Sequence, residues 1–285
     1  MSEITFDVWA IVSELIKKTP GLLLDRNKFL HEAFGTRISE TQLEKIIAGG
    51  DYTDIPIDVL DSVAGSYISK TRLITSGVSF AAGIPSNLLA LPATTSADIV
   101  QSFAFYIRIA QQLAYIYGEK SDFTTMDDDR RMTKILIYIG SMFGIQAASQ
   151  VLVIMSKNAG DILARKFGQV AVTKVLRGIP WKIAKTIAKL LGIRLTKEVA
   201  KKGISKALPI LGGIVSGAIT YTTFGPMAKK LQGSLRDSFQ ASEETIVEVY
   251  EVITSESDND ITTSVDENIK SELTSASEKL GNNND

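Results

Sequence analysis

Three long stretches without a charged residue constrain this chain more than any other feature of its sequence. They cover Leu73–Ala97, Ile135–Ser156 and Ala207–Ala228, and each exceeds the roughly 20 residues that a helix needs to cross a bilayer. Prolines, glutamines or a glycine pair interrupt each of them. We therefore expect buried helical hairpins, or hairpins that dip into a membrane from one side, rather than conventional membrane spans.

The charges that flank these stretches support the same expectation. The basic block Lys157–Lys206 lies between the second and third stretches, and the positive-inside bias would keep it in the cytoplasm. Two crossings around this block would then place the basic clusters Arg130–Lys134 and Lys229–Lys230 on the opposite side of the membrane. True spans are accordingly the least favoured of the three interpretations.

The remaining pattern of the sequence is helical. Period-two alternation between turn residues, which is typical of strands, is missing. Asp25 is placed to cap one short helix, and Ser39 with Gln42 forms a capping box at the start of another. An amphipathic helix is expected over Asp98–Gly118, followed by a polar linker over Glu119–Asp129. The sequence thus predicts an all-α multi-helix bundle with glycine-rich apolar helical hairpins.

Changes in composition along the chain predict three parts. Residues 1–72 form a small N-terminal helical module, and residues 73–240 form a helical core that contains the uncharged stretches. Residues 241–285 form an acidic tail with few large apolar side chains, which we expect to be mostly disordered beyond a helical turn or two near its start.

The composition excludes several classes of chemistry. The absence of cysteine and the presence of a single histidine, His31, exclude disulfide frameworks, thiolate metal sites and multi-histidine centres. No nucleophile motif accompanies His31, and Asp127–Asp129 lacks the spacing of a calcium-binding loop. No metal, cofactor or catalytic residue is therefore assigned, and a non-enzymatic protein is favoured. The first residues lack the features of a signal peptide, which predicts a cytoplasmic location.

A nearly neutral total charge conceals a strong separation of charge along the chain. Lys157–Lys206 holds thirteen lysines and arginines against two acids, whereas residues 241–285 hold twelve acids against two lysines. A basic block of this kind is typical of contact with anionic lipid, nucleic acid or an acidic protein.

Trp181–Lys202 is the strongest candidate site, because it predicts a basic amphipathic helix with an aromatic residue near its start. An anionic membrane surface binds such a helix, and an ordinary core helix with a solvated lysine face is the alternative interpretation. Nucleic acid is an unlikely partner, because lysine outnumbers arginine and few aromatics are interleaved. The proposed membrane-contact residues are Lys174, Arg177, Trp181, Lys182, Lys185, Lys189, Lys197, Lys201 and Lys202.

Two further groups are either structural or in contact with a ligand. Asp98 stands at the head of an apolar helix, where capping is the favoured role, and Arg108 lies too far along the same helix to pair with it. The second group comprises Gly140, Gly144, Gly213 and Gly217, whose four-residue spacings allow helix backbones to approach closely.

Two segments together resemble the EcsC family. The first runs from Ala81-Ala82-Gly83-Ile84-Pro85 through Ala97-Asp98 to Arg108–Gly118, and the second runs from Leu208–Tyr221 to Pro226–Lys230. The resemblance covers about residues 73–240 and departs from the family at Ser96, where a proline often precedes Ala-Asp. It implies a mostly helical bacterial protein at the inner face of the cell membrane, in a family named for a component encoded beside an ABC transporter. It carries over no catalytic residue.

These observations predict a non-enzymatic protein that contacts anionic lipid or a membrane protein through its basic helix, at the cytoplasmic face of the membrane. The acidic tail would compete for the same basic surface. The alternative is a soluble helical protein that holds an apolar ligand, a lipid or isoprenoid, with an enzymatic role left open. A membrane-perturbing effector built from the glycine-rich hairpins is a third hypothesis. The sequence gives no oligomeric state.

Overall fold

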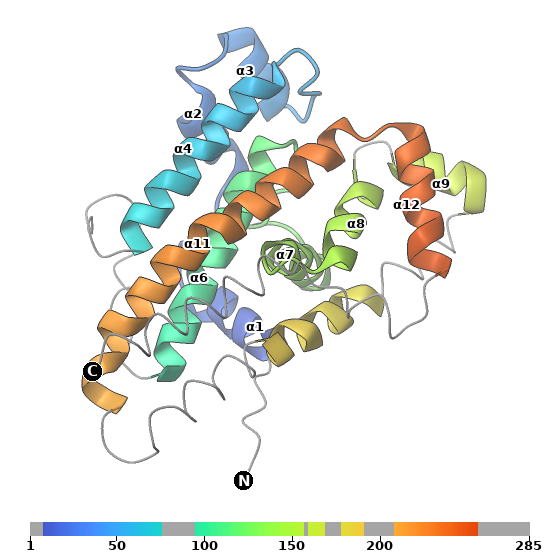
Figure 1. Ribbon diagram of the computed structural model, residues 1–285. Coiled ribbons are helices and arrows are strands. Elements are labelled where there is room, and N and C mark those ends of the chain that lie inside the picture. Colours follow the sequence, from blue (N-terminus) through green and yellow to red (C-terminus); the bar gives the residue numbers. More distant parts are fainter. Residues whose placement is uncertain (1–7, 76–94, 157–158, 169–177, 191–207, 256–285) are drawn as a thin grey trace.

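The computed structural model describes residues 8–75, 95–156, 159–168, 178–190 and 208–255, and these form helices and connecting loops with no strand among them (Figure 1). The all-α prediction is confirmed. The helices are α1 (Val8–Lys18), α2 (Arg26–Phe34), α3 (Glu40–Ile47), α4 (Ile57–Thr75), α6 (Thr95–Ile116), α7 (Asp128–Met142), α8 (Gln146–Ile154), α9 (Ala159–Phe167), α11 (Leu208–Gln240) and α12 (Glu243–Ser255). Residues 178–190 form a further helix, drawn in gold below α7 and α8 in Figure 1.

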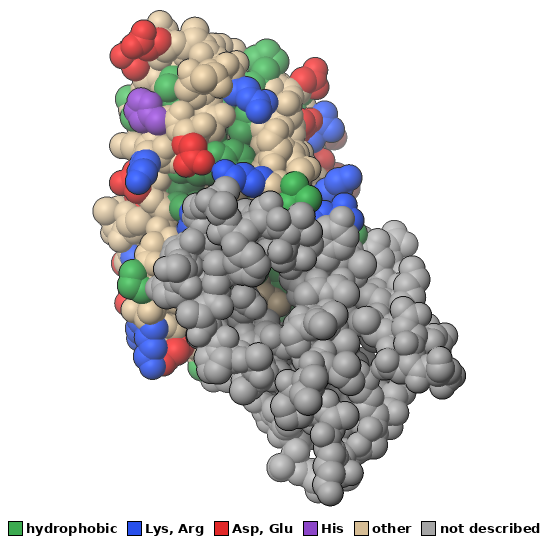
Figure 2. Space-filling view, turned by 90° about the vertical axis from the view of Figure 1, so that its left-hand side faces the viewer, with side chains coloured by type: hydrophobic (Ala, Val, Ile, Leu, Met, Phe, Trp, Pro, Cys, Tyr) green, Lys and Arg blue, Asp and Glu red, His purple; other side chains and the backbone are tan. Residues whose placement is uncertain are grey.

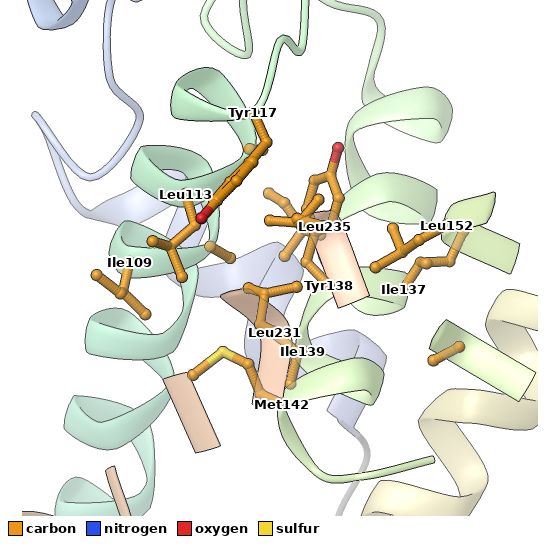
Figure 3. Close-up of a cluster of buried hydrophobic side chains, with 14 of the residues drawn as sticks. Ile109, Leu113, Tyr117, Ile137, Tyr138, Ile139, Met142, Leu152, Leu231 and Leu235 are labelled. Atoms are coloured by element: carbon orange, nitrogen blue, oxygen red, sulfur yellow. The ribbon is translucent and has the colours of Figure 1, made fainter. Parts of the chain in front are cut away.

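Helix α7 lies at the centre of the bundle and is seen end-on in Figure 1, while α11 runs diagonally across the front of α6. Helix α11 packs against α4, α6, α7 and α8. Figure 3 shows part of the resulting core, with side chains from several helices, among them Leu113 of α6, Ile139 of α7, Leu152 of α8 and Leu231 of α11. Burial of this shared apolar surface is the main force that holds the helices together.

Several helices begin where local sequence signals place them. The carboxylate of Asp25 accepts the Lys28 backbone N–H at 2.8 Å and caps α2. Ser39 and Gln42 form the complete capping box of α3. Asp127 caps α7, whose first turn is acidic, as expected for the positive end of a helix dipole.

The second uncharged stretch is a buried helical hairpin, as expected. Its two arms are the apolar part of α7 and α8, and almost all of their side chains are buried in the protein. The turn between them contains Gly144 at a φ of +71°, a conformation that favours glycine over other residues. This stretch therefore belongs to the core.

The third stretch differs from the expectation. From Leu208 onward it is the first part of α11, one continuous helix of 33 residues, so the predicted hairpin is wrong here. The helix even continues through Pro226, which has no N–H to donate. Phe224, Met227 and Ala228 beside this proline are buried, and we attribute the continuity to this packing, which overrides local helix breakers.

Residues 76–94, which make up most of the first stretch, lie outside the described residues. Within the described ranges, no helix combines the length and the apolarity that crossing a bilayer requires.

The expected polar linker after α6 is firmly anchored. Arg26, only 3% exposed, donates from Nε to the Glu119 carbonyl at 2.9 Å and from Nη2 to the Ile46 carbonyl at 2.8 Å. Its Nη1 reaches the Ile47 carbonyl at 3.2 Å, and its backbone N–H donates to Asp122 Oδ2 at 3.0 Å. One buried guanidinium thus joins the start of α2, the end of α3 and the loop between α6 and α7.

The N-terminal helices share one core with the rest of the described chain. A single cluster of buried apolar residues includes Val8 and Leu60 as well as Ile253 near the end of α12. The Tyr115 hydroxyl on α6 donates to the Leu24 carbonyl at 2.9 Å, which adds a polar link. The three-part division of the chain stays a prediction. The acidic C-terminal part contributes the 13-residue helix α12, and residues 256–285 lie outside the described residues.

Candidate functional site

The helix over residues 178–190 has two different faces. Ile179, Ile183 and Ile187, spaced four apart, are buried. Lys185 and Lys189 are exposed on the other side. This is the division that the 3.6-residue helical period imposes on the sequence, and it confirms that this part of the predicted helix is amphipathic.

The apolar face of this helix packs against the protein core. A Cβ added to Gly140 would lie 2.5 Å from Ile183 Cγ2 and 2.9 Å from the Cβ of Ala148. The missing side chain of Gly140 therefore leaves the space that Ile183 fills, at the point where α7, α8 and the helix 178–190 meet. Because the apolar face is covered by the rest of the protein, the lysine face is the side of this helix that a partner can contact.

Two tryptophans meet beside the lysines. Trp181 is 51% exposed, and its ring lies edge-on to that of Trp9 at a centroid distance of 6.5 Å. The Lys185 ammonium lies over the Trp181 ring, 5.3 Å from the centroid. We call Trp9, Trp181, Lys182, Lys185 and Lys189 the aromatic-basic surface. Sequence reasoning missed Trp9, although its place at the start of an amphipathic helix could have drawn attention to it.

The opposite end of the molecule has a different charge pattern. Figure 2 shows that acidic and basic side chains are interspersed over its upper part, where Figure 1 places α2 and α3. The helix 178–190 instead carries three lysines and no acid. A surface of a single charge sign attracts an oppositely charged partner more strongly than a mixed surface does.

Five of the proposed membrane-contact residues, namely Lys174, Arg177, Lys197, Lys201 and Lys202, lie outside the described residues. The other four, Trp181, Lys182, Lys185 and Lys189, lie together on the helix 178–190, where Lys182 is half-buried. The backbone of Asp98 lies in α6 and the backbones of Gly213 and Gly217 lie in α11, while their surroundings are outside the described part of the structure.

Arg108 serves to attach the N-terminal loop. Its Nη1 donates to the Gly21 carbonyl at 2.9 Å. Burial lowers the pKa of the Arg108 guanidinium, and the nearby Glu32 and Tyr67 act in the opposite direction. Gly140 and Gly144 are structural as well, the first through the close approach of Ile183 and the second through its positive φ.

A buried polar cluster lies between α6 and α7. Glu119 forms an ion pair with Lys134, and the Tyr138 hydroxyl donates to Glu119 Oε2 at 3.0 Å. Burial alone would raise the pKa of Glu119, but Lys134 and the hydrogen bonds outweigh it and lower this pKa below its ordinary value. Burial, assisted by the negative charge of Glu119, raises the pKa of Tyr138 well above its usual range. Because these groups satisfy one another, we assign the cluster a structural role.

Two concavities in the described part of the chain have charged walls. Both are open to solvent, one beside Asp161 and Arg165 on α9 and one between Lys166 and the glutamates of α12. Charged walls of this kind do not suit a lipid or isoprenoid. Among the described residues, no three acidic or histidine side chains gather as metal ligands.

Comparison of the chain with protein-family models, curated proteins and solved structures gives no match. The resemblance to the EcsC family therefore stays a hypothesis based on sequence motifs. The aromatic-basic surface is the candidate functional site.

Proposed function

We propose that the protein docks peripherally on an anionic membrane surface through the lysine face of the helix 178–190. The exposure of Trp181 carries this proposal. Indole has an apolar body and a polar N–H, and tryptophan is enriched where hydrocarbon meets lipid headgroups. A half-exposed tryptophan among lysines suits an anionic lipid layer better than it suits water alone.

The docking would be superficial rather than inserted. Because Ile183 and its apolar neighbours are covered by the protein, the free energy of binding would come from the lysines and from the exposed indole. A lysine close to an anionic membrane contributes on the order of 1 kcal/mol, and this contribution decreases with salt. The binding we propose is thus reversible and sensitive to ionic strength.

The cytoplasmic leaflet is the anionic surface that we propose. It carries acidic lipids, and its surface potential attracts basic segments. The resemblance to the EcsC family, with its expected place at the inner face of a bacterial membrane, supports the same location. The alternative to lipid in this proposal is a membrane protein with an acidic cytoplasmic face.

Sedimentation with lipid vesicles tests the proposal. We expect the protein to bind phosphatidylglycerol vesicles and not phosphatidylcholine vesicles. An increase in salt from ~0.1 M to ~1 M should release it, because the Debye length then falls from about 10 Å to about 3 Å. The variant Lys185→Gln/Lys189→Gln should bind at least about tenfold more weakly.

The matched control is Lys28→Gln/Lys70→Gln, which removes two exposed lysines from α2 and α4. It should bind like the wild-type protein, because these lysines lie outside the aromatic-basic surface. An equal loss in both variants would show that only net charge matters. Absence of binding to anionic vesicles would contradict the proposed function, and binding that resists high salt would contradict superficial docking.

A further inference from the structure

The two tryptophans of the chain come from distant parts of the sequence and meet at one place. Trp9 belongs to the first turn of α1 and Trp181 to the first turns of the helix 178–190, and their rings cross at 63° in an edge-on contact. Both are amphipathic side chains, and Trp9 is only partly buried. Figure 1 shows α1 in blue beside the gold helix, on the lower side of the bundle.

The sides of α1 have different environments. Val8, Val12 and Leu15 are buried, and α1 packs through them on α6 and α7. Successive residues of an α-helix lie about 100° apart around its axis. Trp9 therefore lies on one flank of α1, and Lys17, eight residues later, lies about 80° further around the axis, on the side that faces solvent. The flank of α1 that faces Trp181 therefore continues into an exposed lysine.

The charges of α1 are compatible with an anionic partner. Glu14, the one acid within α1, forms an ion pair with Lys18 four residues later. This pairing leaves the charge of Lys17 as the net charge of the helix. Lys17 thus adds one positive charge on α1 to the three lysines of the helix 178–190.

We propose that α1 is the second half of the docking surface, with Trp9 and Lys17 contacting the same anionic lipid layer as Trp181 and its lysines. This inference rests on the proposed function. Two neighbouring helices that each present an indole and at least one lysine fit a broad anionic surface without gaps. A lipid layer provides such a surface, and its headgroup zone accommodates both indoles.

Intrinsic fluorescence tests this inference directly, because all tryptophan emission comes from the surface in question. In Trp181→Phe the only tryptophan is Trp9. On phosphatidylglycerol vesicles with brominated acyl chains, we expect its emission to shift to the blue and to be quenched, as that of Trp181 should be in Trp9→Phe. Phosphatidylcholine vesicles should leave both spectra unchanged.

A charge variant provides a second readout that leaves the aromatic contact intact. Lys17→Gln should weaken binding to phosphatidylglycerol vesicles about threefold to fivefold, whereas Lys28→Gln on α2 should not. Circular dichroism identifies any tryptophan variant that fails to fold, and in that case Lys17→Gln decides the question.

The outcomes separate this inference from the function on which it rests. If Trp181 is quenched while Trp9 is not, and Lys17→Gln binds like the wild-type protein, α1 is not part of the docking surface but the helix 178–190 still is. If neither tryptophan responds, and neither the wild-type protein nor any variant binds phosphatidylglycerol vesicles, both proposals are overturned.

Discussion

Replacing Gly140 by alanine should destabilise the protein by displacing the helix 178–190. The new methyl group would lie 2.5 Å from Ile183 Cγ2 and 2.9 Å from the Ala148 Cβ, whereas carbon atoms pack best at about 3.5–4.0 Å. Both neighbours must therefore move by roughly 1 Å. Overpacking of this kind costs about 1–3 kcal/mol, and we take the upper part of that range because both neighbours belong to packed helices.

The higher helix propensity of alanine offsets part of this loss, by about 1 kcal/mol. The net effect on the free energy of unfolding should be a loss of about 2 kcal/mol, or a fall in melting temperature of roughly 4–8 °C. Denaturant titration and thermal melting measure both quantities. The matched control is Gly65→Ala in α4, where an added Cβ meets nothing within 4 Å, so this variant should be neutral or more stable.

A second substitution shows whether the loss arises from the contact with Ile183. Ile183→Leu removes the Cγ2 methyl group and keeps the volume, so it should recover part of the stability lost in Gly140→Ala. We expect a coupling of about 1 kcal/mol between the two substitutions. If Gly140→Ala instead stabilises the protein as Gly65→Ala does, and the two effects simply add, the helix 178–190 does not pack on α7 and its apolar face is available to lipid.

Four further predictions concern the buried polar groups and the acidic tail. Because the pKa of Glu119 is lowered in the folded protein, its stabilising contribution is present above pH ~4.5 and is lost as pH falls through the folded value. Glu119→Gln should thus flatten the dependence of unfolding free energy on pH below ~4.5, and an unchanged dependence would contradict the assignment. Lys134→Met leaves that carboxylate buried without its cation and should cost about 3 kcal/mol, of which Glu119→Gln in the same chain should restore a part. Arg26→Met removes donors to three backbone carbonyls and should cost at least ~3 kcal/mol, with faster hydrogen exchange in α3 as a local readout. Removal of residues 256–285, which hold eight acids and two lysines, should tighten binding to anionic vesicles at low salt, and unchanged affinity would argue against competition by the tail.

Local chemistry explains why some elements could be predicted from the sequence. A cap needs only the residues beside it, so Asp25, the box of Ser39 and Gln42, and the acidic start of α7 are all visible without knowledge of the fold. Helical periodicity likewise predicts which residues of 178–190 are buried.

Contacts between distant segments explain the rest. Nothing near Trp9 in the sequence indicates that Trp181 lies beside it, and nothing near Arg26 indicates that a loop 93 residues later accepts its Nε–H. The third uncharged stretch looked interrupted because Pro209 and Gly212-Gly213 disfavour a helix locally. Its continuity in α11 depends on four neighbouring helices, which no local pattern can reveal.

The bonds of Arg26 also set an order of events during synthesis. The side chain of Asp122, which accepts the Arg26 backbone N–H, lies 96 residues further along the chain. At about 5–20 residues per second, the ribosome needs roughly 5–19 s to synthesise this segment. During that interval α2 and α3 lack the loop on which their shared guanidinium depends. Helices α2 and α3 of the nascent chain would therefore stay incompletely folded, and slower translation between α4 and α6 would lengthen their exposure to chaperones and proteases.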